Sequence, residues 1–488
     1  MNKFTSPEYG ERLKDMFDEM VVYKDLQESS FINAFKLPSF MRDWVMKKFQ
    51  EEDGSIDHEA TADYIKRYIP KQEDWKSIKN RVVNENERVS FLAKVSVDID
   101  IKTQQVSFDL PDFNLSHKDT AIPEGTWQQC SEALLKADEN WGVVELGYQP
   151  PLGKSQPGKI ILTGFKDFRP YRIDLDEFRE AAHQFKMEEW IDIVLGAIDY
   201  NPAGYMDIGQ KLAMLTRLLP FVEKRLNLIE LAPKGTGKSY LFGSVSRYGW
   251  LSSGGVMSRA RMFYNLGKRT DGLVVGHDFV ALDEVQTISF TDVDEMRGAL
   301  KGYMEKGKCT VGEKEVVSDA GIVLLGNISS DLMTADMREN VFQELPEVFK
   351  ESALIDRFHG FLRGWDLPRM TEDLKVKGWA LNSEFFSTVM HEMREDPVYR
   401  TVVDQWVIVP EGADTRDTEA IKRIATGFLK LIFPYVRKPG DITDMEFKTY
   451  CLSPACRMRD TIRYQLGLLD SEYRGKSIPA LEVRNIGN

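Results

Sequence analysis

The chain has 488 residues, of which 42% are hydrophobic and 29% charged, and its formal net charge is −13. This length is ample for a sizeable core and for three domains. The acidic balance argues against a protein that coats nucleic acid with its whole outer surface, but a ring could still hold it in a local basic channel. No apolar stretch is long enough to span a bilayer and the N-terminus has no apolar signal segment, so we expect a cytoplasmic protein without a membrane partner.

The four cysteines, Cys130, Cys309, Cys451 and Cys456, form no recognisable metal-binding pattern. Cys451 and Cys456 are separated by four residues and have neither a second pair nor a nearby histidine. We therefore expect free thiols in a reducing cytoplasm rather than a zinc site.

Residues 1–88 are predicted to form a mainly helical domain. The apolar residues of 37–49 recur near helical spacing, and those of 58–70 and 73–83 repeat the pattern. We interpret the aromatic residues among them as core.

Residues 89–175 have a β-rich character. Apolar and polar residues alternate over 89–110, and 141–149 and 159–168 are further strand candidates. A small barrel is one candidate fold, and such barrels often bind nucleic acid, although no binding face is identified. The triplet GKS at 153–155 follows two prolines and leads to no helix, so we do not expect it to bind phosphate.

Residues 176–225 return to a helical pattern and lead into Leu226–Ser239, which reads LNLIELAPKGTGKS. The apolar run 226–231 predicts a buried strand, and 240–245 predicts a helix. Strand, glycine-rich loop, GKS and helix together form the phosphate-binding loop of an ATPase. An ordinary turn with an exposed lysine is the alternative, since Ala232 stands where the usual motif has glycine.

The predicted nucleotide-binding residues are Pro233, Lys234, Gly235, Thr236, Gly237, Lys238 and Ser239. Gly235 and Gly237 let consecutive N–H groups face a phosphate, and the following helix adds its positive N-terminal end. We expect Lys238 to reach the β- and γ-phosphates of ATP and the Ser239 hydroxyl to ligate Mg²⁺.

Two further strands end in polar residues, in the order that a AAA+ ATPase requires. The apolar run 279–282 ends in Asp283 and Glu284, which we expect to hold the Mg²⁺ water shell and to polarise the attacking water, respectively. The apolar run 321–328 carries Asn327 at its end, in the place of a sensor-1 residue that bonds the water or the γ-phosphate. Each pattern alone is common, and their order after the GKS makes them specific.

Two arginines complete the predicted ATPase constellation. Arg357, in LIDRFHGFL, is the candidate arginine finger that one subunit donates to its neighbour, with a surface arginine as the alternative. Residues 414–433 begin with Asp and Thr cap candidates and continue as a long helical pattern. Arg416 near its start resembles a sensor-2 arginine, with Arg423 as a second candidate, and TRDTEAIKRIAT is similar to the lid helix of MCM-type replicative helicases.

The whole chain resembles the BrxL family, the Lon-like AAA+ proteins of bacterial BREX phage-defence systems. The stretches that carry the resemblance are VVYKDL, LPSFMRDWVMKKF, KVSVDID, WGVVELGYQP, VMSRARMFYNLGKRTDGLV, YMEKGKCTVGEKEVVSDAGIVLLGNI and LIDRFHGFLRGW. The resemblance implies an MCM-like ring, hexameric or stacked, that uses ATP and Mg²⁺. It also implies duplex DNA in a central channel and other BREX proteins as partners. Family members usually carry a C-terminal Lon-protease-like domain with a Ser–Lys dyad. We find no room for it before Asn488, so protease activity is not expected in this chain.

A lysine-containing hairpin is expected just before the strand 321–328. Residues 309–311 and 315–317 are short strand candidates, with a turn-like Gly312–Lys314 between them. MCM-like ATPases have a hairpin here that points into the pore, and Lys306, Lys308 and Lys314 would then face DNA phosphates. Neighbouring glutamates nearly balance these lysines, so a solvated charged hairpin is an equal alternative.

The predicted fold is a multidomain α/β protein, in which an AAA+ core with a helical lid follows a helical region and a barrel-like, β-rich domain. The expected segments are a helical domain at 1–88, a β-rich and possible DNA-binding domain at 89–175, a helical linker at 176–225, the ATPase core at 226–365, the lid at 366–470 and a tail at 471–488.

The predicted function is an ATP-dependent, ring-forming DNA-binding motor in phage defence. A protein unfoldase of the Lon type and a nucleotide-switched DNA-binding scaffold with little turnover are the alternatives. Unfoldases grip polypeptide with an aromatic pore loop between the phosphate loop and the Asp-Glu strand. The corresponding stretch here has SSGGV at its centre and no aromatic residue there, which favours DNA.

Overall fold

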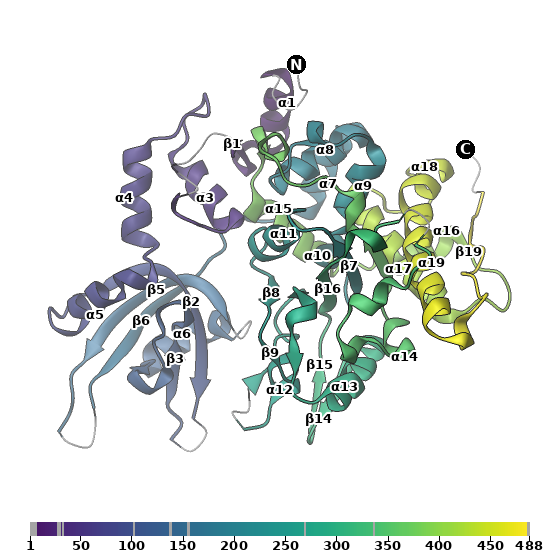
Figure 1. Ribbon diagram of the computed structural model, residues 1–488. Helices are drawn as coiled ribbons and strands as arrows, with labels where there is room; N and C mark the ends of the chain where they lie inside the picture. The colour runs from purple at the N-terminus through teal and green to yellow at the C-terminus, as the bar shows by residue number, and fades with distance from the viewer. Residues whose placement is uncertain are drawn as a thin grey trace. The chain divides into compact units, whose positions relative to one another are not determined.

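The computed structural model describes residues 7–26, 31, 34–100, 103–135, 139–153, 157–267, 270–334 and 337–485. The chain divides into two compact units (Figure 1). Residues 1–47 and 173–488 make the major unit, and residues 48–172 make the minor unit.

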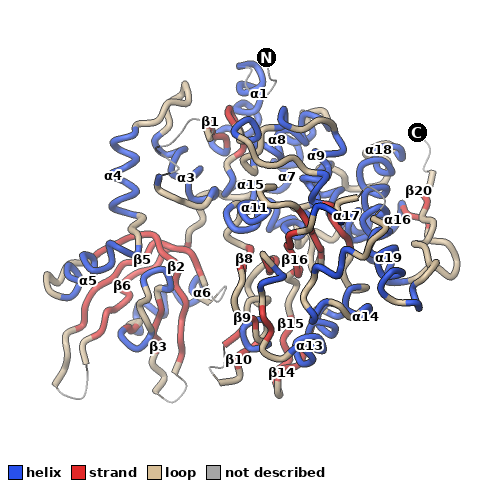
Figure 2. The backbone as a smooth tube through the Cα atoms, in the orientation of Figure 1, coloured by secondary structure: helices blue, strands red, loops and turns tan. Residues whose placement is uncertain are grey.

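The minor unit is built on a five-stranded sheet with the order β3-β2-β5-β6-β4, in which only β4 and β6 run parallel. Figure 2 shows these strands together with helices of the same unit. The elements are α4 (His58–Tyr68), α5 (Trp75–Val83), β2 (Val89–Ile99), β3 (Val106–Asp109), β4 (Thr120–Ala121), α6 (Glu124–Leu134), β5 (Asn140–Gln149) and β6 (Lys159–Asp167). Alternate strand residues such as Phe91, Phe108 and Val144 form its core with residues of α5 and α6. The predicted strands are confirmed, whereas α6 was not expected.

The two edge strands of this sheet, β3 and β4, contact each other through a few individual hydrogen bonds. The Thr120 hydroxyl donates to the Phe108 carbonyl at 2.5 Å and accepts from the Phe108 N–H at 2.9 Å. The Ile122 N–H donates to the Val106 carbonyl at 2.8 Å. No ladder joins β3 to β4 within the described ranges, so closure into a barrel stays a prediction. Residues 154 and 155 of the GKS triplet lie outside the described residues.

The major unit contains a five-stranded, fully parallel sheet with the order β17-β7-β16-β12-β8. Its strands are β7 (Leu228–Ala232), β8 (Gly249–Ser253), β12 (Phe279–Asp283), β16 (Gly321–Asn327) and β17 (Gly360–Arg363). The inner strands β7 and β12 are buried at every residue, as continuous apolar runs in a doubly covered parallel sheet should be. Parallel strands present their carboxyl ends at one edge, so the loop that follows β7 and the polar residues that end β12 and β16 converge there.

The helices of this unit are α1 (Pro7–Phe17), α3 (Ser39–Phe49, which continues into the minor unit), α7 (Leu175–His183), α8 (Met187–Ala197), α9 (Ile208–Thr216), α10 (Leu219–Val222), α11 (Lys238–Ser244), α12 (Arg259–Met262), α13 (Val293–Lys306), α14 (Ser352–Ile355), α15 (Ser383–Met393), α16 (Val398–Trp406), α17 (Thr415–Ile432), α18 (Asp444–Phe447) and α19 (Ser453–Leu469). In the described part of the unit, short strands form five two-stranded pairs: β1 (Val21–Asp25) with β18 (Lys377–Leu381), β9 (Val256–Met257) with β13 (Ser289–Phe290), β10 (Tyr264–Asn265) with β11 (Thr270–Asp271), β14 (Lys308–Val311) with β15 (Lys314–Val317), and β19 (Val407–Ile408) with β20 (Glu482–Val483).

The N-terminal segment divides differently from the sequence prediction of one helical domain over residues 1–88. β1 pairs antiparallel with β18, which follows it by about 350 residues, so the first 47 residues belong to the major unit. Helices α4 and α5 belong to the minor unit instead. Local periodicity finds the helices but carries no information about which distant strand β1 will pair with.

The C-terminal part of the major unit is helical, as the pattern over 366–470 predicts. The predicted cap of its longest helix is present, because the Asp414 carboxylate accepts the Asp417 N–H at 3.0 Å and satisfies one free donor of α17. Residues of the expected tail add a strand, β20, to the preceding β19.

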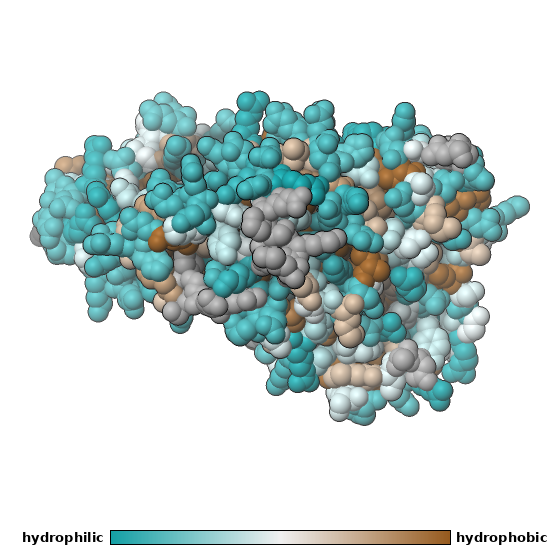
Figure 3. Space-filling view, turned by 90° about the horizontal axis from the view of Figure 1, so that it is seen from above, coloured by the Kyte–Doolittle hydropathy of each residue, from teal (hydrophilic) through white to brown (hydrophobic). Residues whose placement is uncertain are grey.

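The face of the molecule in Figure 3 is mainly hydrophilic, with scattered apolar residues. This is the surface expected of a chain that is 29% charged. Within the described ranges, no helix combines the length and the apolar character needed to cross a bilayer. All four cysteines are free thiols.

Candidate functional site

The loop between β7 and α11 curls so that its carbonyl groups are bonded on one side. The Gly235 carbonyl accepts the Met370 N–H at 2.7 Å, and the Thr236 carbonyl accepts Arg217 Nη1 at 2.7 Å. The Gly237 carbonyl accepts the Tyr200 hydroxyl at 3.2 Å. In a trans peptide the next N–H points opposite to the carbonyl, so the N–H groups that follow these carbonyls face the other side of the loop. Such a row of N–H groups is what a phosphate needs.

Glycine is required at two positions of this loop. Gly235 and Gly237 have φ angles of +82° and +78°, in the region that side chains disfavour. A Cβ atom at Gly237 would also lie 2.5 Å from the Tyr200 hydroxyl. Ala232, by contrast, ends β7 in extended backbone, so the departure from the usual motif needs no glycine there.

Lys238 and Asn327 are brought together by α11 and β16. Lys238 is 7% exposed, and its ammonium donates to the Asn327 side-chain oxygen at 3.0 Å. Burial lowers the pKa of Lys238, and the carboxylates of Glu230, Asp283 and Glu284 act in the opposite direction. The predicted lysine therefore lies within electrostatic reach of the predicted Asp-Glu pair.

Ser239 and Asp283 also meet, although they are 44 residues apart. The Ser239 hydroxyl donates to the Asp283 carboxylate at 2.5 Å. A hydroxyl and a carboxylate oxygen this close are the hard ligands that Mg²⁺ prefers, so the residues present fit the ion.

Glu284 lies directly beyond the end of β12 and has the positive φ of +48°. Its N–H donates to the Asp283 carboxylate at 2.9 Å, and its carbonyl accepts the Thr287 N–H at 2.7 Å. The side chain is exposed and is bonded to no other group in the described part of the chain. The Glu284 carboxylate is therefore exposed directly beyond the carboxyl end of β12.

Sequence reasoning missed the residues that support the phosphate loop and the end of β16 through hydrogen bonds. Arg217 is buried under the loop and pairs with Glu230 at 2.5 Å while it bonds the Thr236 carbonyl. Gln286 donates to the Asn327 carbonyl at 2.5 Å and accepts its N–H at 3.3 Å, which fixes the end of β16. A signal for the first pair was present, since Glu230 is a charge inside an apolar strand and a buried charge needs a partner.

The two predicted arginines lie in another pocket. Arg357 and Arg416 line a cavity of about 360 Å³ together with Arg225, Arg423 and His359. None of the loop residues 233–239 lines it. One chain therefore carries the phosphate loop and the arginine cluster at separate places.

Acidic residues hold these arginines in the single chain. Arg357 pairs with Glu305, and Arg416 lies 3.8 Å from the same carboxylate. Arg416 also pairs with Asp356 at 2.5 Å. Burial acts to raise the pKa of Asp356, but the guanidiniums of Arg459 and Arg416 hold it below its ordinary value.

The predicted hairpin is confirmed as β14 and β15, with one change. Lys314 is not in the turn but begins β15 opposite Val311, so the turn is Gly312–Glu313. The Lys314 ammonium lies 5.5 Å from the centre of the Tyr264 ring. Lys308 pairs with Glu315 at 2.9 Å, and Lys306 ends α13. Lys308 is thus partly neutralised within the hairpin.

Comparison with known families decides the relationship of the chain. A family model described as "Lon-like protease BrxL-like, ATPase domain" matches residues 160–478, and one described as "BREX system Lon protease-like protein BrxL N-terminal" matches residues 15–148. The chain belongs to the BrxL family. The predicted resemblance is thereby confirmed, and the phosphate loop, Asp283, Glu284 and Asn327 all lie within the ATPase-domain match.

Two curated relatives of the BrxL family match most of the chain. The "Lon-like protease BrxL" of Escherichia coli O9:H4 (strain HS) is 28% identical over 458 residues, which cover 93% of this chain and 64% of the relative. The "Lon-like protease BrxL" of Bacillus cereus (strain H3081.97) is 26% identical over 428 residues, or 87% of this chain and 62% of the relative. The chain thus spans somewhat under two thirds of the length of these relatives.

Proposed function

We propose that this BrxL-family chain is an ATP-dependent, ring-forming DNA-binding motor that acts in BREX phage defence in the cytoplasm. The observation that carries the proposal is the separation of the phosphate loop from the arginine cluster in one chain. A hydrolysis site that uses both needs two copies, and a ring supplies each phosphate loop with a neighbour's arginines. The order β17-β7-β16-β12-β8 and the helices α15–α19 support the AAA+ assignment, with these helices as the lid.

The residues at the strand ends divide the work of ATP hydrolysis. The loop N–H groups and Lys238 bind the phosphates, and Asn327 orients the γ-phosphate or the attacking water. Glu284 accepts a proton from that water through its free carboxylate. Ser239 and Asp283 would hold Mg²⁺, which when bound offsets phosphate charge.

ATP turnover and assembly test this proposal together. We expect the purified chain to hydrolyse ATP, duplex DNA to change the rate, and electron microscopy with DNA to show rings, either hexameric or stacked. A Lys238→Ala variant is the control that should lose nucleotide binding. Monomers under all nucleotide and DNA conditions would refute the ring, and an absence of turnover would favour the nucleotide-switched scaffold.

Duplex DNA is the proposed occupant of the ring channel, with other BREX proteins as further partners. The stretch SSGGV spans the end of β8, the turn Gly254–Gly255 and the start of β9 and has no aromatic residue, which supports DNA over the polypeptide of an unfoldase. The hairpin β14–β15 and the minor unit are the two candidate contacts.

Lys314→Ala tests the hairpin. We expect weaker DNA binding regardless of DNA sequence, because phosphate contacts carry no sequence information. The log–log salt slope should become smaller by about 0.9 per lost phosphate contact. Fluorescence anisotropy with labelled duplexes at several salt concentrations measures both. Lys438→Ala, an exposed lysine elsewhere in the major unit, is the control. Equal slopes for the two variants would remove the hairpin from the DNA path and favour the minor unit.

A further inference from the structure

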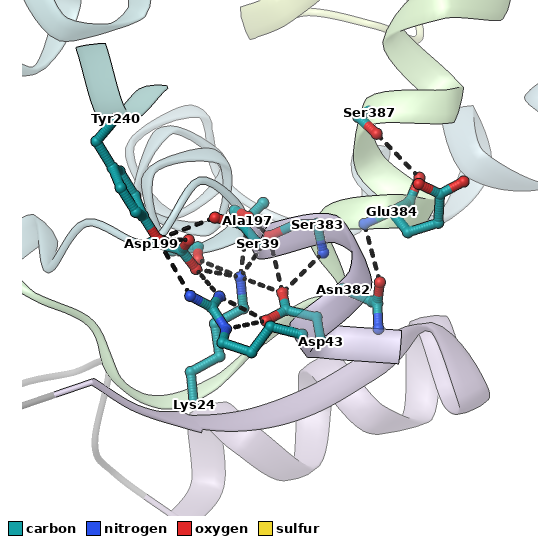
Figure 4. A network of polar contacts seen from close by, with 12 residues as sticks. Lys24, Ser39, Asp43, Ala197, Asp199, Tyr240, Asn382, Ser383, Glu384 and Ser387 are labelled. Atoms are coloured by element: carbon teal, nitrogen blue, oxygen red, sulfur yellow. Dashed lines mark hydrogen bonds and ion pairs between the residues drawn. The ribbon is translucent and has the colours of Figure 1, made fainter. Parts of the chain in front are cut away.

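Beside the phosphate loop lies a buried cluster of charged residues that the ATPase motifs do not include. Lys24, from β1, pairs with Asp43 at 2.8 Å and with Asp199 at 3.0 Å, and it is fully buried. Arg42 pairs with the same two carboxylates at 2.5 and 2.6 Å. Figure 4 shows Lys24, Asp43 and Asp199 converging from separate parts of the chain. The cluster has two cations and two anions and is therefore neutral.

This cluster is also saturated with hydrogen bonds. Lys24 donates to the Ala197 carbonyl at 2.9 Å, and the Asp43 carboxylate accepts the hydroxyl and N–H of Ser383 at 2.7 and 3.0 Å. Buried ion pairs are stable only when such bonds satisfy them, and removal of one member would leave an uncompensated charge. The N-terminal segment is thereby fixed rigidly against Asp199.

Asp199 adopts a backbone conformation that side chains rarely take. Its φ angle is +76°, in the left-handed region, and it lies between α8 and the segment that leads to α9. Such outliers persist when the surroundings over-determine them, and they cluster at functional sites. The conformation turns the Asp199 carboxylate into the cluster while the next residue, Tyr200, reaches the phosphate loop.

Two tyrosines connect this cluster to the residues on either side of Lys238 and Ser239. Tyr200 donates to the Gly237 carbonyl at 3.2 Å, directly before Lys238. Tyr240, directly after Ser239, donates to the Asp199 carboxylate at 2.7 Å. Figure 4 shows Tyr240 pointing from α11 towards Asp199.

The hydroxyl of Tyr240 is the better bonded of the two. It accepts from Arg42 Nη1 at 3.1 Å and lies 2.9 Å from the Ser39 hydroxyl. Burial and the Asp199 carboxylate raise its pKa, so the phenol stays protonated and can donate. The residue is nevertheless 40% exposed, so the hydroxyl end alone is enclosed. A tyrosine that served only to fill the core would have its ring buried as well as its hydroxyl.

We propose that Tyr240 is a positioning residue of the nucleotide site, held by Asp199 and Arg42, and that it fixes the first turn of α11 so that Lys238 and Ser239 face the phosphates and Mg²⁺. Tyr200 fixes Gly237, the residue directly before Lys238, through its bond to the Gly237 carbonyl. The inference rests on the proposed ATP binding at the loop. It extends the nucleotide site to Lys24, Ser39, Arg42 and Asp43, which precede the phosphate loop by about 200 residues.

Tyr240→Phe tests the proposal because it removes one hydroxyl and keeps the ring. The dissociation constant of the fluorescent analogue mant-ATP should rise about tenfold, the order expected for a lost hydrogen bond to a charged group. The Mg²⁺ concentration for half-maximal binding should also rise, since Ser239 is the neighbouring residue. Tyr200→Phe, at the other anchor, should shift both quantities in the same direction.

Tyr399→Phe is the matched control. Its hydroxyl also accepts from an arginine, Arg179 at 3.3 Å, and donates to a carbonyl, that of Pro434. Thermal unfolding should shift for Tyr240→Phe and for Tyr399→Phe, whereas mant-ATP and Mg²⁺ affinity should change for Tyr240→Phe and stay unchanged for Tyr399→Phe. Equal nucleotide affinity of Tyr240→Phe and Tyr399→Phe would overturn the proposal. If Tyr240→Phe does not fold, an unchanged affinity of Tyr200→Phe overturns it. Lys238→Ala distinguishes failure of the Tyr240 proposal from failure of the proposed ATP site, because unaltered mant-ATP binding in that variant would refute the ATP site itself.

Discussion

Replacing Arg357 by alanine is expected to lower the rate of ATP hydrolysis by about 10³–10⁵-fold, the range for loss of an arginine finger. The variant should still bind ATP, because Arg357 lies in the arginine pocket and no residue of the loop 233–239 lines that pocket. Steady-state turnover and mant-ATP binding, measured on the same preparation, check both statements. Arg437→Ala, which removes an exposed arginine that pairs with Asp396 at 2.5 Å, is the matched control.

Mixing experiments show whether Arg357 acts on the neighbouring subunit. Arg357→Ala subunits keep an intact phosphate loop, and Lys238→Ala subunits keep an intact arginine. Some interfaces of a mixed ring therefore combine two intact halves, and part of the activity should return. A complete lack of recovery at every mixing ratio, in rings shown to contain both variants, would count against action in trans. If Arg357→Ala subunits alone hydrolyse ATP at the wild-type rate, Arg357 is not an arginine finger.

Glu284→Gln is expected to reduce turnover by about 10²–10⁴-fold, the usual contribution of a positioned base. Glutamine has nearly the same shape but cannot accept the proton from water. Nucleotide affinity should stay unchanged, because Lys238 keeps its bond to Asn327 and Ser239 keeps its bond to Asp283. The prediction depends on the exposed carboxylate of Glu284, directly beyond the end of β12.

Single-turnover hydrolysis with excess protein measures the chemical step directly and separates it from product release. Glu392→Gln, an exposed glutamate on α15, is the control for the loss of one negative charge. Parental hydrolysis by Glu284→Gln would show that another residue activates the water. Loss of ATP binding in the same variant would instead assign Glu284 a role in holding the loop.

The sequence by itself determined the strand, glycine-rich loop and helix at 228–244, the Asp283–Glu284 pair at the end of a strand and the strand that ends in Asn327. Each is a local pattern, in which an apolar run predicts a buried strand and the next residues carry the chemistry. Their meeting follows from one rule, since parallel strands end at one edge of a sheet. The contacts of Lys238 with Asn327 and of Ser239 with Asp283 agree with that rule.

Only the tertiary structure decided what holds those residues in place. Arg217 beneath Thr236, Tyr200 on the Gly237 carbonyl, and Tyr240 on Asp199 depend on contacts between segments that no periodicity relates. The same holds for the pairing of β1 with β18, which assigns the first 47 residues to the major unit. The physical reason is that hydrophobic pattern and turn chemistry act over a few residues, whereas a buried charge such as Lys24 can be satisfied by any partner that the complete fold brings to it.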